Sequence, residues 1–426
     1  MPGRLAASAA RALNARAAEL PALAWSFAYF FCLLCGYYIL RPLRDEMGIA
    51  GGIENLPWVF TATFVVMLAV VPLFGWISAR FPRRVFVPLV YWFFAANLLA
   101  FFALFESGLD REWLARAFFV WVSVYNLFVV SVFWSLMADL FSNEQARRLF
   151  GAIAAGGSAG AIAGPALTAT LVGTLEPVQL LLLSAGFLGG AILCIHRLLA
   201  WARHRHHAGG GGSEREGPMG GSILAGLRLL ARSPYLLGIC LFVLLFTTLS
   251  TFLYFEQAHI VEDAFASSAE RTRVFAVIDL LVNILTITAQ LFVTGRLMDR
   301  LRLGWALALV PAAVLVGFVA LALAPVLAVL VAFQVVRRAG NYAITRPARE
   351  VLFTVVGREA KYKAKNVIDT VVYRGGDAAS GWVFDGLKGL GLSLSAIAWV
   401  AVPVAAVWIA TAWLLGRRQE QLRREQ

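Results

Sequence analysis

Charged and polar side chains recur at helical spacing inside long apolar stretches of this chain. In the stretch 21–45, Tyr37, Arg41 and Arg44 follow one another at intervals of four and three residues, which places them on one face of a helix. Guanidinium groups form forked hydrogen bonds with phosphate or carboxylate oxygens. The spacing therefore predicts that these three side chains bind an anionic, phosphate-bearing solute. The alternative is that the two arginines pair with Asp45 or with an acid on another helix.

Later apolar stretches carry polar side chains of the same kind. Their spacing groups them on helical faces as Asp279 with Asn283, Arg337 with Asn341, and Asp369 with Tyr373 and Asp377. Charged groups inside a bilayer are costly, and they usually face a bundle interior or a water-filled cavity. We therefore expect the first six of these residues to bind substrate and the last, Asp377, to act in coupling or gating. Internal pairing within the bundle is the alternative.

Carboxylates near the ends of apolar stretches are candidates for coupling or gating. Asp45 closes the stretch 21–45, Asp139 closes the stretch 113–139, and Glu256 closes the stretch 234–256. Acidic residues in such positions can carry a coupling proton through a transport cycle. A plain position at the membrane interface is the alternative for the last two.

The composition sets the class of protein. Hydrophobic residues make up 60% of the 426 residues and charged residues 15%, and the mean hydropathy is +0.75. No soluble fold buries that much apolar surface. The apolar runs have the length of about 20 residues that crosses a bilayer as a helix. They predict spans at 21–45, 58–78, 85–106, 113–139, 149–173, 177–200, 234–256, 273–295, 303–323, 325–345, 364–386 and 392–416.

A break in this series divides the chain into two halves. The stretch Arg203–Ser222 is hydrophilic and rich in glycine, which is the composition of a flexible linker. The predicted fold is an all-α integral membrane protein of twelve transmembrane helices in two six-helix halves. We expect the first half to be 1–200, the cytoplasmic linker 201–233 and the second half 234–426.

Other kinds of site have little support in the sequence. The four cysteines lie in apolar runs, where we expect them to pack between helices. The small-residue stretch Gly151–Pro165 lacks the lysine of a phosphate-binding loop and is expected to pack against another helix. The basic residues lie between the spans, which argues against nucleic acid. We expect no cofactor, no metal and no enzyme activity, and a monomer whose partners are a small anionic solute and membrane lipids. An intramembrane enzyme and a sensor or scaffold that does not transport are the alternatives.

The loop after the eighth predicted span has a recognisable pattern, GRLMDR. Gly295, Leu297, Asp299 and Arg300 match the G-x-L-x-D-R signature, and the loop resembles that of major facilitator transporters. The resemblance implies a cytoplasmic latch that forms in one conformation only, with Asp299 and Arg300 in gating. A basic turn that only sets topology is the alternative.

Three further segments share a family pattern. LRPLRD (Leu40–Asp45) is similar to L-R-D-T-K-D, and Phe133 and Trp134 followed by QARRLF (Gln145–Phe150) are similar to F-W and E-A-K-R-F-Y. The longest segment, Asn341–Ser380, follows K-Y-x-x-x-D-P-x-K-E and K-x-K-G-K-A-A-I-D without a gap. Together they resemble the ATP/ADP translocase family of nucleotide transporters, a relative of the major facilitators.

The resemblance implies a twelve-helix carrier that exchanges nucleotides, with basic residues of the first span and of the region 325–386 at the substrate. Three positions depart from the family pattern, because Pro42 replaces an acid, Arg346 an aspartate and Asp377 a lysine. The fourth predicted span also has no carboxylate ahead of Phe133. The alternatives are therefore another organic anion or an anionic phospholipid, and both exchange and proton symport stay open.

The distribution of basic residues predicts the topology. Arginine and lysine gather in the even-numbered loops and at both ends of the chain, and basic loops stay on the cytoplasmic side of a membrane. We predict a multi-pass protein of a bacterial-type inner membrane with both termini and the linker 201–233 in the cytoplasm. Reporter fusions at these three places measure their location, and a fusion in the loop 107–112 is the external control. An external signal from either terminus would refute the topology.

Overall fold

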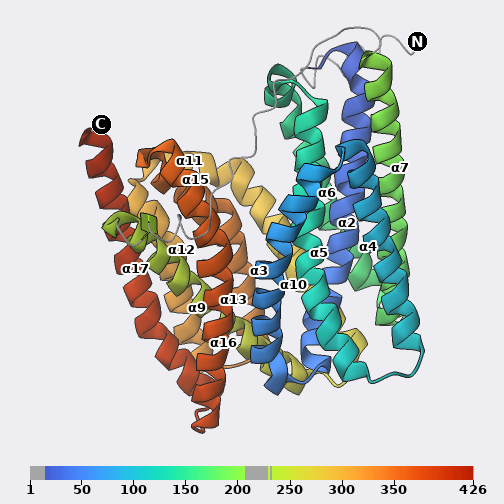
Figure 1. Cartoon of the computed structure of the whole chain (residues 1–426). Helices are drawn as coiled ribbons and strands as arrows, with labels where there is room; N and C mark the ends of the chain where they lie inside the picture. Colours follow the sequence, from blue (N-terminus) through green and yellow to red (C-terminus); the bar gives the residue numbers. More distant parts are fainter. Residues whose placement is uncertain (1–14, 207–228, 231–232, 426) are drawn as a thin grey trace. The chain divides into compact units, whose positions relative to one another are not determined.

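The computed structural model describes residues 15–206, 229–230 and 233–425 (Figure 1). This part of the chain is built of helices and contains no β-strand. The predicted all-α fold class is therefore confirmed. Arg4, Arg11 and most of the predicted linker 201–233 lie outside the described residues.

Short connections join the helices that cover the first six predicted spans. Asp110 caps its helix by accepting hydrogen bonds from the amides of Glu112 and Trp113, and Ser142 forms a capping box with Gln145. In chain order the elements are η1 (Ala17–Glu19), α2 (Leu20–Ala50), η2 (Ile53–Asn55), α3 (Leu56–Arg80), α4 (Arg83–Glu106), α5 (Arg111–Leu140), α6 (Asn143–Leu171), η3 (Pro177–Gln179) and α7 (Leu180–His206).

The rest of the chain contains several interrupted helices. Its elements are α9 (Pro234–Ala264), α10 (Ser268–Ala289), η4 (Gln290–Thr294), α11 (Gly295–Arg300), α12 (Leu303–Leu323), α13 (Leu327–Gly340), η5 (Asn341–Thr345), α14 (Arg346–Leu352), η6 (Phe353–Val355), α15 (Arg358–Val367), η7 (Ile368–Val372), α16 (Tyr373–Gly389) and α17 (Leu394–Glu425). Ten helices of the described part are long and apolar enough to cross a membrane. The other two predicted spans, 325–345 and 364–386, fall on the stretches that the π-helical turns η5 and η7 interrupt.

The chain forms two compact units. Unit 1 comprises Met1–Ala50, Ala69–Gly217 and Ser267–Leu280, and unit 2 comprises Gly51–Leu68, Pro218–Ala266 and Leu281–Gln426. Helices α3 and α10 therefore each contribute one part to unit 1 and the other part to unit 2. The division into halves at 1–200 and 234–426 stays a prediction.

In unit 1, α2 lies among α5, α6 and α7 (Figure 1). Three glycines at intervals of four residues allow α6 to come close to α2: Gly156, Gly160 and Gly164. A Cβ atom at Gly164 would lie 2.6 Å from the carbonyl oxygen of Cys35. At the other two glycines it would overlap the carbonyl oxygens of Phe27 and Phe31. The small residues therefore let the two helix backbones meet, which confirms the packing role predicted for Gly151–Pro165.

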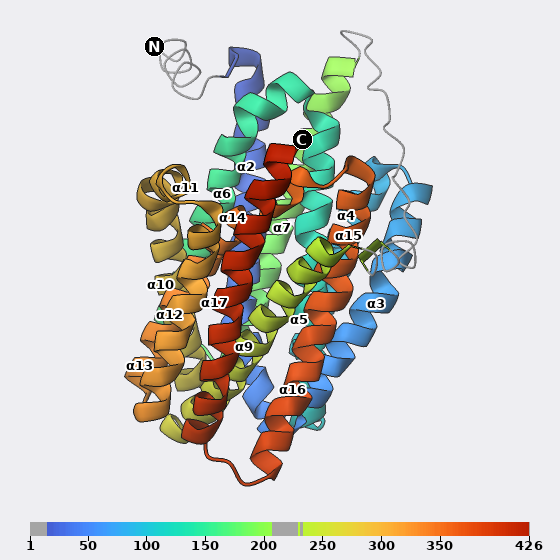
Figure 2. The ribbon, with the colours of Figure 1, turned by 90° about the vertical axis from the view of Figure 1, so that its left-hand side faces the viewer.

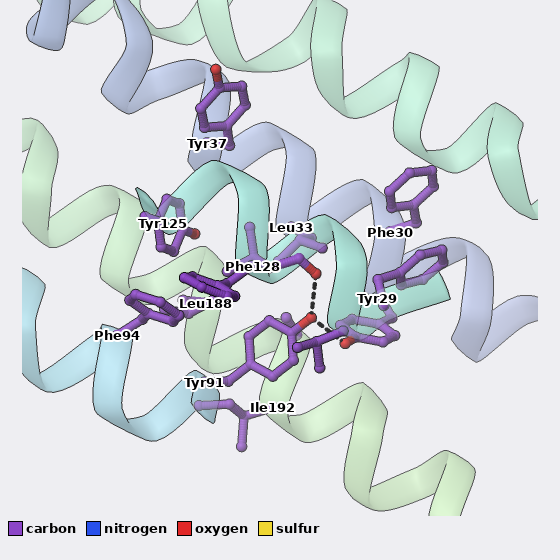
Figure 3. Close-up of a cluster of buried hydrophobic side chains, with 14 of the residues drawn as sticks. Tyr29, Phe30, Leu33, Tyr37, Tyr91, Phe94, Tyr125, Phe128, Leu188 and Ile192 are labelled. Carbon is purple, nitrogen blue, oxygen red and sulfur yellow. Dashed lines mark hydrogen bonds between the residues drawn. The ribbon is translucent and has the colours of Figure 1, made fainter. Parts of the chain in front are cut away.

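Buried aromatic side chains pack around α2 (Figure 3). Tyr91 of α4 donates a hydrogen bond to the carbonyl oxygen of Val129 in α5 at 2.8 Å, and Tyr29 of α2 donates one to the Tyr91 hydroxyl at 2.5 Å. Phe30 stacks on Phe133 of α5 with 4.1 Å between ring centroids. The hydroxyls of Tyr29 and Tyr91 are thus satisfied inside an apolar cluster, and they fix the register of three helices.

The carboxylate of Glu19 ties the start of α2 to the start of α6. Glu19 is 1% exposed and accepts hydrogen bonds from Gln145 at 2.8 Å, from Arg148 at 3.1 and 3.2 Å, and from the Arg16 amide at 2.9 Å. Burial raises the pKa of Glu19, but these hydrogen bonds and the charge of Arg148 outweigh it and lower the pKa to about 2. The group is therefore ionised at neutral pH.

In unit 2, α9 lies beside α16 and α17, and α12 lies beside α17 (Figure 2). Phe252 and Phe255 of α9 meet Phe384 of α16 edge to face, with ring centroids 5.6 and 5.2 Å apart. The first part of α3 joins this unit. The ring centroids of Trp58 in α3 and Trp382 in α16 lie 4.8 Å apart. These contacts hold α9 and α16 in place, and both helices carry polar residues of the candidate sites.

Replacing Gly160 by alanine should destabilise the fold. The added methyl group has no room beside the α2 backbone, and overpacking typically costs about 1–3 kcal/mol. Gly151→Ala on the same helix is the matched control, because nothing lies within 4 Å of its Cβ position. This control should leave the free energy of unfolding unchanged or raise it by up to ~1 kcal/mol, because alanine has the higher helix propensity. Thermal unfolding in detergent compares the two, and a Gly160→Ala variant as stable as wild type would contradict the close contact.

Candidate substrate and coupling sites

The face of α2 predicted to bind an anion meets charged residues of α10. Arg41 Nε lies 3.6 Å from Asp279 Oδ2, and the Asp279 side chain is 1% exposed. The Arg41 guanidinium also lies over the ring of Tyr38, 5.7 Å from its centroid. The distance between the charged atoms exceeds the roughly 2.7–2.9 Å of a charge-assisted hydrogen bond. Two predicted substrate-binding residues from distant parts of the sequence therefore meet as a loose ion pair.

Arg44 contacts the residue that follows it. Its Nε donates to Asp45 Oδ1 at 3.1 Å, and its guanidinium lies over the Phe119 ring, 5.0 Å from the centroid. Tyr37 is buried, at 7% exposure. For Arg41 and Arg44 alike, the contacts are those of the pairing alternative left open by the sequence. The part of these side chains in solute binding stays a prediction.

A second ion pair joins the same two helices and was not predicted from the sequence. Arg271 Nη2 donates to Glu46 Oε1 at 3.0 Å, and the two side chains are 14% and 0% exposed. Both residues stand just outside the predicted spans 21–45 and 273–295, where charged residues are ordinary. Complementary charge at the span ends is the signal that could have found them, but the sequence does not tell which ends meet.

A buried polar network in unit 2 surrounds Arg337. Its guanidinium donates to Ser250 Oγ at 2.7 Å and to Gln334 Oε1 at 2.9 Å. Gln334 in turn donates to Gln257 Oε1 at 2.7 Å. Arg337 is 9% exposed and the next residue, Arg338, is 8% exposed. The chain of hydrogen bonds fixes the Arg337 guanidinium between α13 and α9.

The predicted acids of η7 and α16 contact basic side chains. Arg349 Nη2 lies 3.1 Å from Asp369 Oδ1. Arg374 Nη1 lies 3.6 Å from Asp377 Oδ2, and Thr251 of α9 donates to Asp377 Oδ1 at 3.3 Å. Neither arginine was a predicted site residue. The charge of each acid is therefore balanced locally within unit 2.

Single π-helical turns occur beside these residues. Asn341 begins η5, and Pro347 follows it in α14. A proline cannot donate to the carbonyl four residues earlier, and its ring collides with that carbonyl in a regular helix. Here that carbonyl belongs to Ala343, and Thr294 of η4 donates to it at 2.9 Å. The proline thus explains the wide turn, and turns of this kind are frequent at functional sites.

The remaining predicted residues have different settings. Asn283 and Asn341 are buried, at 7% and 9% exposure. Tyr373 packs against Phe246 with 5.9 Å between ring centroids, and Glu256 is fully buried. Three predicted coupling or gating residues are exposed near helix ends: Asp139, Asp299 and Arg300. Their roles stay predictions.

Side chains that could ligate a metal do not gather in the described residues. No group of three or more His, Cys, Asp or Glu side chains is placed there to hold an ion. The free thiols of Cys35 and Cys194 are buried, which agrees with the packing role predicted for them, and those of Cys32 and Cys240 are half-buried.

Comparison with known families decides the class of protein. A family model described as the Major Facilitator Superfamily matches residues 15–359. The chain belongs to the Major Facilitator Superfamily. The match covers the first ten of the twelve predicted spans. It also covers the GRLMDR loop, whose resemblance to a major facilitator signature was noted from the sequence.

Solved structures share the fold of this major facilitator. The nucleoside transporter NupG matches with a TM-score of 0.62 at 12% identity, covering 95% of this chain and 98% of that one. An auto-inhibited POT family peptide transporter gives 0.62 at 14% identity with 95% and 97% covered. A bacterial homologue of the iron transporter ferroportin gives 0.62 at 14% identity with 94% and 98% covered. At these identities the likeness shows the fold alone. A search of curated proteins finds no match by sequence.

Family and fold together establish the general function. The chain is a multi-pass membrane transporter of the major facilitator type. These three structures are named as a nucleoside transporter, a peptide transporter and a homologue of an iron transporter. The solute of this transporter must therefore be argued from its own residues.

Breaking the pair of Glu46 and Arg271 from one side should destabilise unit 1. Either Glu46→Gln or Arg271→Gln leaves one buried charge uncompensated, which costs about 3–5 kcal/mol. The double variant Glu46→Met, Arg271→Met should recover most of that loss. Glu112→Gln is the control, because the Glu112 side chain is 63% exposed in its pair with Arg116, and such pairs contribute about 0.3–0.5 kcal/mol. The unfolding free energies of wild type and the three variants give the coupling energy between Glu46 and Arg271. A coupling energy near zero would show that this pair does not stabilise the fold.

Proposed function

We propose that this major facilitator is a secondary-active transporter of an anionic, phosphate-bearing solute such as a nucleotide, and that it works by alternating access. The observation that carries the proposal is the burial of guanidinium groups within its helices. Arg337 and Arg338 are 9% and 8% exposed, and the Arg41 side chain is 14% exposed. Charged side chains buried within the helices of a membrane protein mark the pathway of a substrate or ion.

A phosphate suits these side chains better than a neutral solute does. A guanidinium presents its donors in a planar fork that matches two oxygens of one phosphate. A neutral solute offers no charge to offset the cost of removing a guanidinium from water. At Arg41, where the carboxylate atom of Asp279 lies 3.6 Å away, a phosphate oxygen can approach to about 2.8 Å and compete for the guanidinium.

The resemblance to the ATP/ADP translocases supports a nucleotide within this class. The segments Leu40–Asp45 and Asn341–Ser380 carry that resemblance. They include Arg41 and the two π-helical turns that contain Asn341 and Asp369. Another organic anion or an anionic phospholipid remains the alternative, because the family pattern is broken at positions such as Arg346. The binding experiment below separates these solutes.

In the proposed mechanism, the solute changes the partners of existing charges. Arg41 attracts Asp279, and Arg44 hydrogen-bonds Asp45. A phosphate that takes over one of these arginines releases its carboxylate. A ligand shifts a conformational equilibrium only as far as its affinities for the two states differ. Arg41 of α2 and Asp279 of α10 both belong to unit 1, so in this proposal solute binding changes how these two helices are joined.

Ligand-dependent stabilisation tests the solute. Purified protein is heated with ATP, ADP, a sugar phosphate, a dicarboxylate, an anionic phospholipid or a neutral sugar. A ligand at a hundredfold excess over its Kd stabilises by about 2.7 kcal/mol, so ATP and ADP should raise the Tm clearly. Arg44→Gln combined with Asp45→Asn should abolish the shift while leaving the Tm without ligand within a few degrees. Arg41→Gln combined with Asp279→Asn should do the same, because the pair is then removed as a neutral unit. Arg197→Gln, at an exposed arginine of α7, is the control and should keep the shift.

The other outcomes of this experiment are equally definite. A shift caused by neutral sugars alone would overturn the anion proposal and leave the arginines as internal charge pairs. A shift with only a sugar phosphate or a phospholipid would keep the anion and replace the nucleotide. Uptake of radiolabelled ATP into proteoliposomes then separates a transporter from a sensor or an enzyme that binds the same ligand.

A further inference from the structure

Glu256 is a carboxyl group buried without a hydrogen bond. It lies in α9, a helix long and apolar enough to span a membrane, and its side chain is 0% exposed. Neither of its carboxyl oxygens has a hydrogen-bond partner within the described residues. Buried polar groups are nearly always hydrogen-bonded, so two unsatisfied oxygens on one acid require an explanation.

The neighbours of Glu256 on α9 have partners elsewhere. Phe255 packs against the ring of Phe384 at 5.2 Å between centroids. Gln257 accepts a hydrogen bond from Gln334 at 2.7 Å. The Nδ1 atom of His259 lies 2.8 Å from the carbonyl oxygen of Phe255. The helix turn around Glu256 therefore supplies aromatic surface and amide groups that are already engaged.

Charged groups on the elements that pack against α9 do not hydrogen-bond Glu256 either. Those elements are η2, α13, η7, α16 and α17. Arg337 binds Ser250 and Asp377 binds Thr251, which lie about 8–9 Å before Glu256 along the helix axis. Glu262 and Asp263 follow on α9 itself, beyond His259. The last part of α17, from Arg417 on, is also charged. Before it, the other charged side chains on these five elements are Glu54, Arg338, Asp369, Arg374, Asp385 and Lys388.

An ionised carboxylate in such a place is far more costly than the neutral acid. We propose that Glu256 is a proton-binding site and that its proton is coupled to transport, which rests on the transport function proposed above. In the conformation described here the carboxyl group is neutral. In the other conformation water reaches it, the O–H bond breaks, the electron pair stays on the carboxylate and the proton passes to water.

A structural role does not account for an acid at this position. Methionine or leucine would fill the same volume without two unsatisfied oxygens, and glutamine would keep the shape without a proton to exchange. A group that lowers stability is kept where it serves a function. The position also suits a coupled site, because the adjacent Gln257 is joined through Gln334 to the buried Arg337.

Infrared spectroscopy of the full-length protein in liposomes detects the proton directly. The carbonyl stretch of a protonated carboxyl group is separate from the bands of carboxylates. At neutral pH the spectrum of wild type minus Glu256→Gln should contain this protonated-carboxyl band. Glu54→Gln, at an exposed glutamate, is the control and should leave the band in place. If the Gln variant does not fold, Glu256→Met replaces it, since methionine suits an apolar site. A difference spectrum without the band would overturn the proton site.

Transport then tests the coupling, with radiolabelled ATP as the probe. Wild-type proteoliposomes should take up ATP faster when the outside is made acidic. Glu256→Gln should lose that stimulation and keep exchange of external for internal ATP. Retained stimulation in the variant would overturn the coupling. If wild type does not transport ATP at all, the nucleotide proposal fails, while the infrared band still decides the proton site independently.

Discussion

An ionised group buried in these helices needs a partner, because the hydrocarbon of a bilayer supplies no hydrogen bonds. Glu19 meets Arg148 between the starts of α2 and α6. Glu46 meets Arg271 between α2 and α10. The buried polar contacts therefore decide which helices are neighbours, and the apolar side chains then fill the space around them. A single substitution in one of these pairs therefore weakens the contact between two helices and destabilises the fold.

Close packing around α2 complements these charge pairs. The glycine face of α6 lets two backbones meet along Phe27 to Cys35, which leaves no room for side-chain adjustment there. The next part of α2, from Tyr37 to Glu46, carries Arg41 and Glu46, which form ion pairs with α10. One helix therefore combines a tightly packed part with a charged part, and in the proposed mechanism the partners of that charged part change. This arrangement suits a carrier, because a rigid helix transmits a local change of partner along its length.

Much of the fold follows from the sequence, because apolar run length and helical spacing are local properties. All twelve predicted spans fall in helices, and the polar residues picked out by spacing, such as Asp279 and Asn283, are buried. Pairing is different, since spacing within one helix says nothing about which other helix it touches. Arg271 and Arg349 were missed for this reason. The wide turn before Pro347 was open to prediction from the proline alone, but its contact with Thr294 was not.

The two proposals for this transporter rest on the same electrostatic requirement. A charge buried in a membrane helix can change its neighbours only if something else compensates it at the same moment. For Arg41, whose partner Asp279 lies 3.6 Å away, the compensating group is a phosphate oxygen of the solute. For Glu256, which has no hydrogen-bond partner among the described residues, it is a proton. Under these two proposals, neither Arg41 nor Glu256 is left ionised and alone when anion and proton bind in the same cycle, and the electrostatic cost of moving between two conformations is then lowest.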